Sequence, residues 1–180
     1  MIVGLTGAYC AGKGEAAAYL AKKGFEYFSC SDEIRSILKE KGVEPGRDAM
    51  IKEGNELRKK FGAGYLASRI ARKLKKSGVV DSIRNVEEIN VLRETGKFIL
   101  VYIDAPPELR FERAKKRGRA GEGETFEEFM EKENRERSTE INEQQLDLCM
   151  EQADYKIMND SSLEDLHRQI DGVINRELKA

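Results

Sequence analysis

A glycine-rich segment near the start of the chain is the strongest chemical signal in the sequence. It reads GAYCAGK and has the G-x-x-x-x-G-K spacing of a phosphate-binding P-loop. Glycines let the backbone turn tightly, so that successive N–H groups point at a phosphate, and Lys13 would add a positive charge over the outer phosphates. An apolar run precedes the segment and a helical pattern follows it, as the motif requires. The residues predicted to hold the phosphates are Gly7, Ala8, Tyr9, Cys10, Ala11, Gly12, Lys13, Gly14 and Glu15.

The position after the lysine departs from the usual P-loop. A Ser or Thr hydroxyl that ligates Mg²⁺ commonly follows the lysine, whereas this chain has Gly14 and then Glu15. Two interpretations of Glu15 stay open. It holds the metal ion through water, or it is an acid of the first helical turn that the helix dipole favours.

Two further acid–arginine pairs follow short predicted strands. In open α/β sheets, ligands bind beyond the carboxyl ends of the strands. Asp32 is expected there to hold Mg²⁺ through water, and Arg35 to clamp a substrate phosphate; the alternative is a helix cap, from Ser31 or Asp32, with a surface arginine. Asp81 ends a buried run and needs a partner such as a metal ion or Lys13, or else simply starts a turn. Arg84 lies just beyond it.

An arginine series forms the fourth candidate. Arg110, Arg113 and Arg117 recur at helical spacing, and Arg119 follows them. Like charges on one helix face are unfavourable unless anions neutralise them, and polyphosphate does this well. The alternative is a solvated face whose charge nearby glutamates balance; the candidates are Glu108, Glu112, Glu131, Glu133 and Glu136.

Short apolar runs separated by amphipathic stretches indicate the elements that position these residues. Non-alternating strands of this kind are typical of a parallel sheet with both faces covered, so the predicted class is α/β, one domain over residues 1–180. The expected strands are Ile2–Thr6, Glu26–Phe28, Gly78–Asp81, Phe98–Ile103 and Asp154–Met158. The expected helices are Glu15–Lys23, Asp32–Lys41, Asp48–Phe61, Tyr65–Lys76, Val86–Glu94, Pro106–Arg117, Phe126–Arg137 and Ser162–Leu178.

Composition narrows the function classes. The 180 residues carry 32 Lys and Arg against 33 Asp and Glu, which disfavours a generally basic nucleic-acid binder. No apolar run approaches the ~20 residues that span a bilayer, so no membrane partner is expected. The three cysteines include no close pair, which argues against a disulfide framework or zinc site and favours a reducing, cytoplasmic setting. A monomer or a homodimer is expected.

Five motifs together carry a resemblance to a known family. They are GLTGAYCAGKG, SDEIR, VVDSIRNVEE, APPELRFERAKKRGR and ADYKIMND. In this order they resemble the nucleoside monophosphate kinase group of P-loop proteins, of which adenylate kinase and dephospho-CoA kinase are characterised members. The likeness is greatest to small adenylate-kinase-like or dephospho-CoA-kinase-like proteins that are frequent in archaea. The resemblance implies a three-layer P-loop NTPase fold with strand order 2-3-1-4-5, and ATP and Mg²⁺ as cofactors.

The resemblance also implies roles for individual residues. It implies an acceptor-binding helical region at about 32–76 and a short lid at about 113–137. Catalytic roles fall to Lys13, Asp32, Asp81, Arg113 and Arg117. Arg119 joins the lid arginines, and Asn159 resembles a residue that lies near the adenine. The residues expected to contact the acceptor are Arg35, Arg84, Asn55 and Arg58.

The expected activity is transfer of the γ-phosphoryl group of ATP to a small nucleotide-like acceptor. The acceptor is a nucleoside monophosphate or, alternatively, the ribose hydroxyl of dephospho-CoA. Two rival functions stay open: a nucleotide-binding regulatory protein or slow NTPase, and an interaction module with a decayed P-loop.

Overall fold

A parallel sheet forms the centre of the computed structural model, which describes residues 1–118 and 125–179. The strand order is β2-β3-β1-β4-β5, and each neighbouring pair is parallel. This confirms the predicted α/β class and strand order. The strands are β1 (Ile2–Gly7), β2 (Glu26–Ser29), β3 (Gly78–Asp81), β4 (Phe98–Asp104) and β5 (Tyr155–Met158).

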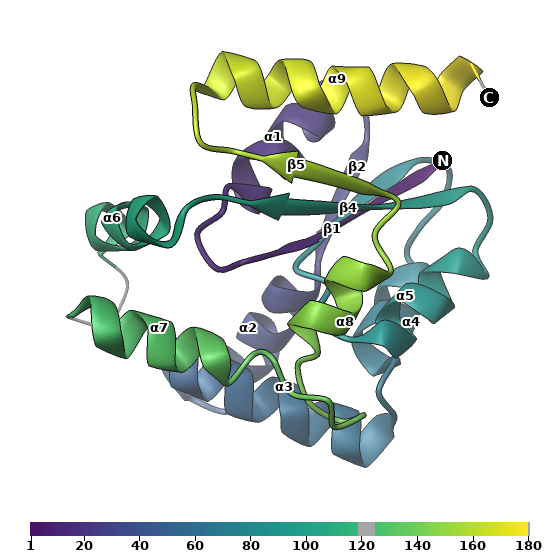
Figure 1. The fold of residues 1–180 in the computed structure, drawn as a ribbon. Helices are drawn as coiled ribbons and strands as arrows, with labels where there is room; N and C mark the ends of the chain where they lie inside the picture. Colours follow the sequence, from purple (N-terminus) through teal and green to yellow (C-terminus); the bar gives the residue numbers. More distant parts are fainter. Residues whose placement is uncertain (119–124, 180) are drawn as a thin grey trace.

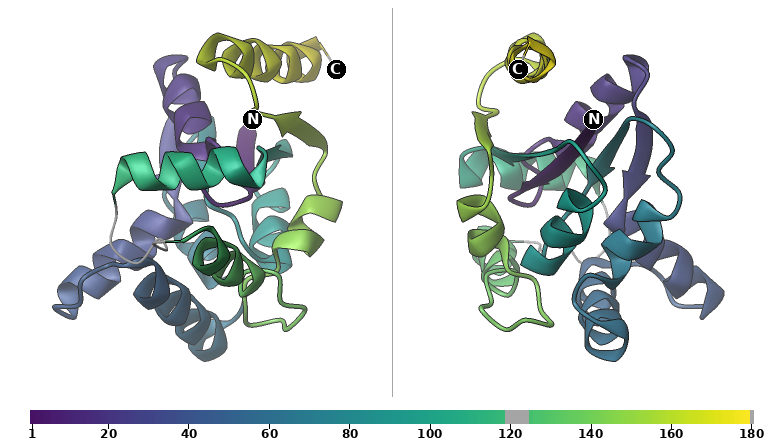
Figure 2. Two further views of the ribbon diagram at one scale, coloured as in Figure 1. Left: turned by 60° about the vertical axis from the view of Figure 1, so that its left-hand side comes forward. Right: turned by 90° about the vertical axis from the view of Figure 1, so that its right-hand side faces the viewer.

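Helices cover both faces of the sheet (Figure 1). Helices α1 and α9 pack on one face and α2, α4, α5 and α8 on the other, while α6 and α7 lie beyond the carboxyl ends of β1 and β4 (Figure 2). Helices on both faces of the sheet give the three-layer arrangement that the family resemblance implies. The helices are α1 (Lys13–Lys22), α2 (Cys30–Glu40), α3 (Arg47–Phe61), α4 (Tyr65–Ala71), α5 (Val86–Arg93), α6 (Pro107–Arg117), α7 (Phe126–Asn134), α8 (Leu146–Glu151) and α9 (Leu163–Lys179).

The two faces of the sheet carry separate apolar cores. Val3 and Leu5 of β1 pack against α1 and α9, whereas Ile2 packs with the helices of the opposite face. All three side chains are buried. A strand buried on both faces reads as a continuous apolar run, which is why β1 and β4 were recognisable in the sequence.

Most observed bounds lie within two residues of the predicted ones, and the larger differences are in three places. Helix α4 ends at Ala71 rather than Lys76, because the chain turns there and Leu74 packs toward the core. Helix α7 ends at Asn134 rather than Arg137. Helix α8 was not predicted. It follows a segment without regular structure, residues 135–145, which we call the return segment because it leads the chain back to the sheet. The Gln145 N–H donates to the Arg84 carbonyl (2.7 Å) and holds the end of this segment in place. In the described part of the chain, no helix is long and apolar enough to cross a membrane.

Candidate active site

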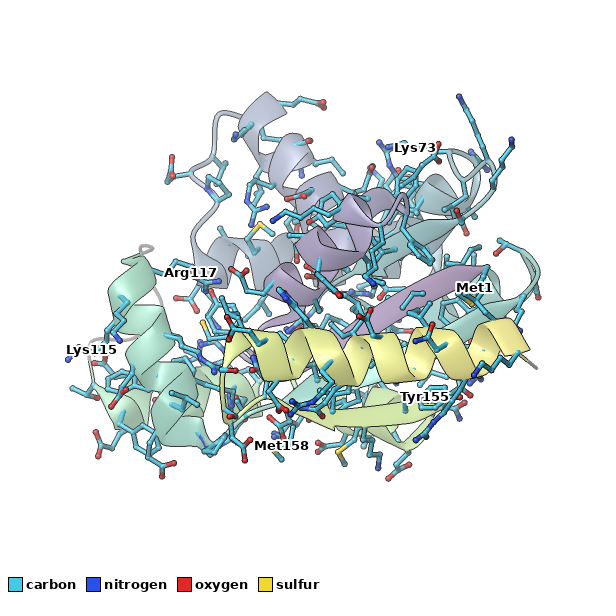
Figure 3. All side chains as sticks on the ribbon, turned by 90° about the horizontal axis from the view of Figure 1, so that it is seen from above. Met1, Lys73, Lys115, Arg117, Tyr155 and Met158 are labelled. Atoms are coloured by element: carbon cyan, nitrogen blue, oxygen red, sulfur yellow. The ribbon has the colours of Figure 1, made fainter. Side chains whose placement is uncertain are left out.

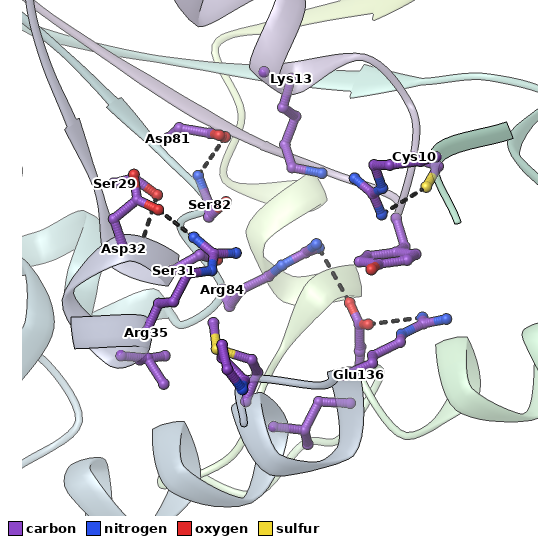
Figure 4. A pocket seen from close by; sticks show the side chains of 18 of the residues that line it. Cys10, Lys13, Ser29, Ser31, Asp32, Arg35, Asp81, Ser82, Arg84 and Glu136 are labelled. Atoms are coloured by element: carbon purple, nitrogen blue, oxygen red, sulfur yellow. Dashed lines mark hydrogen bonds and ion pairs between the residues drawn. The ribbon is translucent and has the colours of Figure 1, made fainter. Parts of the chain in front are cut away.

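A cavity of about 790 Å³ opens at the carboxyl edge of the sheet and brings most of the predicted site residues together. The P-loop, the ends of β2 and β3, and helices α2, α3 and α6 contribute to its walls (Figure 4). Asn55 is not among the lining residues, and Arg119 lies outside the described residues. The predicted residues that line the cavity are Tyr9, Cys10, Gly12, Lys13, Gly14, Glu15, Asp32, Arg35, Arg58, Asp81, Arg84, Arg113, Arg117 and Asn159.

The P-loop connects β1 to α1 and needs glycine at two positions. A Cβ on Gly7 (φ +135°) would lie 1.9 Å from the Ile103 carbonyl oxygen, and one on Gly12 (φ +107°) would lie 2.2 Å from Asn159 Nδ2. Both backbone angles are ones that side-chain-bearing residues rarely adopt. The same Asn159 Nδ2 donates to the Ala11 carbonyl (2.8 Å), so this side chain braces the loop from behind. A contact of Asn159 with adenine stays a prediction.

Lys13 is buried at the centre of the loop. Its Nζ donates to the carbonyls of Gly7 (2.9 Å) and Ala8 (2.8 Å), and only 7% of the residue is exposed. Burial, together with the positive charge of Arg84, lowers the pKa of Lys13 to about 7, although Asp81 acts in the opposite direction. The ammonium group therefore lacks a full counter-charge, which phosphate oxygens at this position would supply.

Asp81 ends β3 beside this lysine (Figure 4). Its Oδ1 accepts from the Ser82 N–H (2.5 Å), and Ser82 has a φ of +63°. Burial raises the pKa of Asp81, whereas the charge of Lys13 lowers it. Within the described residues Asp81 makes no ion pair within 4 Å, so the expected pairing with Lys13 is electrostatic and not a direct salt bridge. Arg84 Nη1 donates to the Gly7 carbonyl (2.6 Å) and ties the end of β3 to the P-loop.

Asp32 and Arg35 face the cavity as a pair on α2. They form an ion pair one turn apart, and Asp32 Oδ2 also accepts from the Tyr27 hydroxyl (3.2 Å). The helix cap is neither Ser31 nor Asp32, because Ser29 Oγ accepts the Asp32 N–H (3.3 Å). Much of the charge of Arg35 is thus already balanced.

The arginine series divides into two groups. Arg110 is buried against Glu133, so the glutamate alternative is correct for this residue. Arg113 Nη2 donates to the Asn159 carbonyl (3.0 Å), while its Nη1 is buried without a hydrogen-bond partner. Burial lowers the pKa of Arg113. Arg117, whose side chain lies near the P-loop, donates to Cys10 Sγ (3.1 Å), whereas Lys115 points outward from α6 (Figure 3).

Arg58 forms a buried ion pair with Glu88. Its Nε and Nη2 donate to Glu88 Oε1 at 3.0 Å and 2.8 Å, and both side chains are almost completely buried. Asn55 accepts from Arg58 Nη1 (3.4 Å). The guanidinium that was expected to contact the acceptor therefore holds α3 to α5, and its contact with an acceptor stays a prediction.

Sequence reasoning did not assign Arg47, Glu136 or Gln144 to the cavity wall, although Glu136 was among the glutamates expected to balance the arginines. Arg47 pairs with Glu136 (2.8 Å), and its guanidinium carbon lies 3.9 Å from the centre of the Tyr9 ring. Glu136 also lies 3.4 Å from Arg84, and Gln144 completes this side of the cavity. One signal was available for Arg47, because a cation in the first turn of a helix opposes the helix dipole and needs another reason to be there.

Comparison with known proteins identifies the family of this chain. Residues 3–140 match the family model described as "AAA domain". The chain is 33% identical over 187 residues to a UPF0200 protein of Pyrococcus abyssi, covering 99% of this chain and 97% of that protein. It is therefore a UPF0200 family member. A UPF0200 protein of Methanosarcina mazei is 31% identical over 185 residues, covering 99% and 96%.

Solved structures extend the likeness to the fold of this UPF0200 member. A shikimate kinase from Acinetobacter baumannii, in complex with shikimate, superposes with a TM-score of 0.63 at 17% identity, covering 98% of this chain and 93% of that one. A shikimate kinase from Aquifex aeolicus gives 0.60 at 15% identity, covering 100% and 99%. The superpositions show that the chain has the P-loop NTPase fold that the sequence motifs indicated.

Proposed function

We propose that the protein transfers the γ-phosphoryl group of ATP to a small, nucleotide-like acceptor. The observation that carries the proposal is the gathering of Lys13, Asp81, Arg113 and Arg117 around one cavity at the mouth of a P-loop. Phosphoryl transfer demands little covalent chemistry from a protein; it demands alignment of donor and acceptor and neutralisation of the developing charge.

Different groups of the chain would align the donor and neutralise its charge. Backbone N–H groups of the P-loop and the N-terminus of α1 would hold the β- and γ-phosphates, with Lys13 over them. Arg113 offers a buried, unpartnered Nη1 that a phosphoryl oxygen would satisfy. Arg117 would contact the same phosphates from the end of α6. The predicted lid, of which residues 119–124 lie outside the described residues, would exclude water and so favour transfer over hydrolysis.

Magnesium fits this site as an ion held partly by water. In the described residues no group of three or more His, Cys, Asp or Glu side chains could hold a metal ion. Mg²⁺ commonly keeps several waters and takes only one or two carboxylates, with substrate phosphates completing its shell. Glu15 in the first turn of α1 and Asp32 on α2 both line the cavity and would hold such an ion through water. Bound there, it would neutralise charge on the β- and γ-phosphates.

A coupled assay of ADP release across a panel of acceptors tests the proposal. The panel contains nucleoside monophosphates and dephospho-CoA, the two acceptor types that the motifs suggest. We expect acceptor-dependent ADP from the wild-type protein and its loss in Lys13→Ala. Lys22→Ala, an exposed lysine at the end of the same helix, is the matched control and should retain activity. Folded protein that releases no acceptor-dependent ADP would contradict the proposal.

A nucleotide-binding regulatory protein or slow NTPase is the second candidate. Gly14 in place of the usual metal-binding hydroxyl favours it, since a weakly held metal ion slows transfer. Such a protein would be stabilised against heat by ATP, because ligand binding to the folded state raises the melting temperature. It would show no increase in ADP with any acceptor, so thermal melting and the coupled assay together separate the two functions.

A further inference from the structure

Buried polar atoms without a hydrogen-bond partner gather on the side of the cavity that borders the Tyr9 ring and Arg84. Arg47 Nε and Nη1, Glu136 Oε2 and Gln144 Oε1 are buried and have no hydrogen-bond partner within the described residues. Arg47, Glu136 and Gln144 are only 5%, 2% and 8% exposed, yet all three line the cavity. Buried polar atoms nearly always have partners, so a ligand is expected to supply them here. The Glu136 and Gln144 oxygens accept hydrogen bonds and the two Arg47 nitrogens donate them. A complementary ligand would therefore offer both donors and acceptors.

The arginines expected to hold an acceptor phosphate are already balanced. Arg35 is paired with Asp32 on its own helix. Arg84 donates to the Gly7 carbonyl and faces the Glu136 carboxylate at 3.4 Å (Figure 4). A phosphate brought to Arg84 would lie against this buried carboxylate, and like charges at such a distance disfavour each other. The cavity wall therefore disfavours an acceptor that binds through its own phosphate at this position.

We propose that the acceptor is an alcohol whose hydroxyl groups donate to Glu136 and Gln144, while one of its oxygens accepts from Arg47. The inference rests on the proposed phosphotransfer and names the substrate class for that same site. Ile34, Met50 and Ile51 line the cavity as well, and their carbon atoms suit the ring or chain that carries the hydroxyls. A ribose diol and a simple polyol share this chemistry.

The reaction then makes a phosphate ester. The acceptor hydroxyl oxygen forms a bond to the γ-phosphorus, and the bond from that phosphorus to the oxygen bridging it to the β-phosphate breaks, so that ADP leaves with the bond's electron pair. The hydroxyl proton passes to the Asp81 carboxylate, which lines the cavity, and from there to solvent. Transfer to a nucleoside monophosphate would instead make a phosphoanhydride.

Identification of the bond that is made tests the inference. Wild-type protein is incubated with ATP, Mg²⁺ and, separately, adenosine, ribose, myo-inositol, dephospho-CoA, AMP or CMP, and the products are read by ³¹P NMR. We expect a phosphate-ester resonance with at least one hydroxyl acceptor and no phosphoanhydride formation from AMP or CMP. Phosphoanhydride as the sole product would overturn the inference and leave the phosphotransfer intact. ATP binding without any product would overturn both.

A variant of the cavity wall provides an independent test. Gln144→Met keeps the approximate size of the side chain and removes its hydrogen-bonding amide. With the alcohol that gives the ester, we expect KM for the acceptor to rise about tenfold, equivalent to ~1.4 kcal/mol, while the Kd for ATP stays unchanged. Gln169→Met on α9, outside the cavity, is the matched control. An unchanged acceptor KM in Gln144→Met would overturn the assignment of this wall to the acceptor.

Discussion

Binding of nucleotide should draw a proton onto Lys13. In the protein without an anion, burial holds the pKa of Lys13 at about 7, against an ordinary value of 10.5. Phosphate oxygens next to Nζ favour the charged form and return this pKa toward its ordinary value. Binding and protonation of the lysine are therefore linked above pH 7.

The size of the effect follows from the pKa. A group with a pKa of 7 is about nine-tenths neutral at pH 8 and about one-tenth neutral at pH 6. Nucleotide binding should thus take up about 0.9 proton at pH 8 and about 0.1 at pH 6 at this residue. The same linkage makes the affinity fall by up to about tenfold for each pH unit above 7, until the pKa of the bound state is reached.

Calorimetry in buffers of different ionisation enthalpy measures this uptake directly. The wild-type protein is compared with Lys13→Arg at both pH values, with ATP and Mg²⁺ at the same concentrations. Arginine stays charged throughout, so protonation of the nucleotide itself is common to both proteins and the difference reports Lys13. Equal uptake by the two proteins at pH 8 would refute the reasoning, because it would mean that the buried lysine is already charged before nucleotide binds.

Three further outcomes are expected from other positions. Gly12→Ala should lower the free energy of unfolding by about 1–3 kcal/mol in urea titrations and abolish thermal stabilisation by ATP, because the new Cβ meets Asn159 Nδ2; an unaltered ATP shift would contradict this. Arg58→Met should cost about 3–5 kcal/mol of unfolding free energy by leaving Glu88 buried without its partner, and a loss below 1 kcal/mol would argue against that burial. Arg113→Lys should reduce kcat about 100-fold with little change in the Kd for ATP, whereas a change in Kd alone would assign this arginine to ground-state binding.

The sequence was sufficient for the sheet and the P-loop because both depend on local pattern. The apolar runs of β1 and β4 are continuous, and the glycine spacing fixes where β1 must turn into α1. The strand order came from the family resemblance and was confirmed. The alternative that placed the cap of α2 at Ser31 or Asp32 was wrong, since Ser29 has an equally suitable side chain and the path of β2 selects it.

Charge pairing across the cavity could not be predicted in the same way. Helical spacing placed Arg110 in one series with Arg113, but of the two only Arg113 lines the cavity, because Arg110 is paired with Glu133 of α7. Glu136 falls at the end of the predicted helix Phe126–Arg137, and Gln144 lies in a polar segment for which no element was predicted. Their burial depends on α7 and α8 packing near the carboxyl edge of the sheet, which is a property of tertiary structure alone.

The brace from Asn159 to Ala11 has a consequence for how the protein is made. The two residues are 148 positions apart, and the asparagine follows the last strand of the sheet. A nascent chain emerging from the ribosome carries Lys13 and the arginines long before it carries this side chain. Until β5 has docked beside β4, the loop lacks its rear support, so nucleotide can assist folding only after Asn159 has been synthesised.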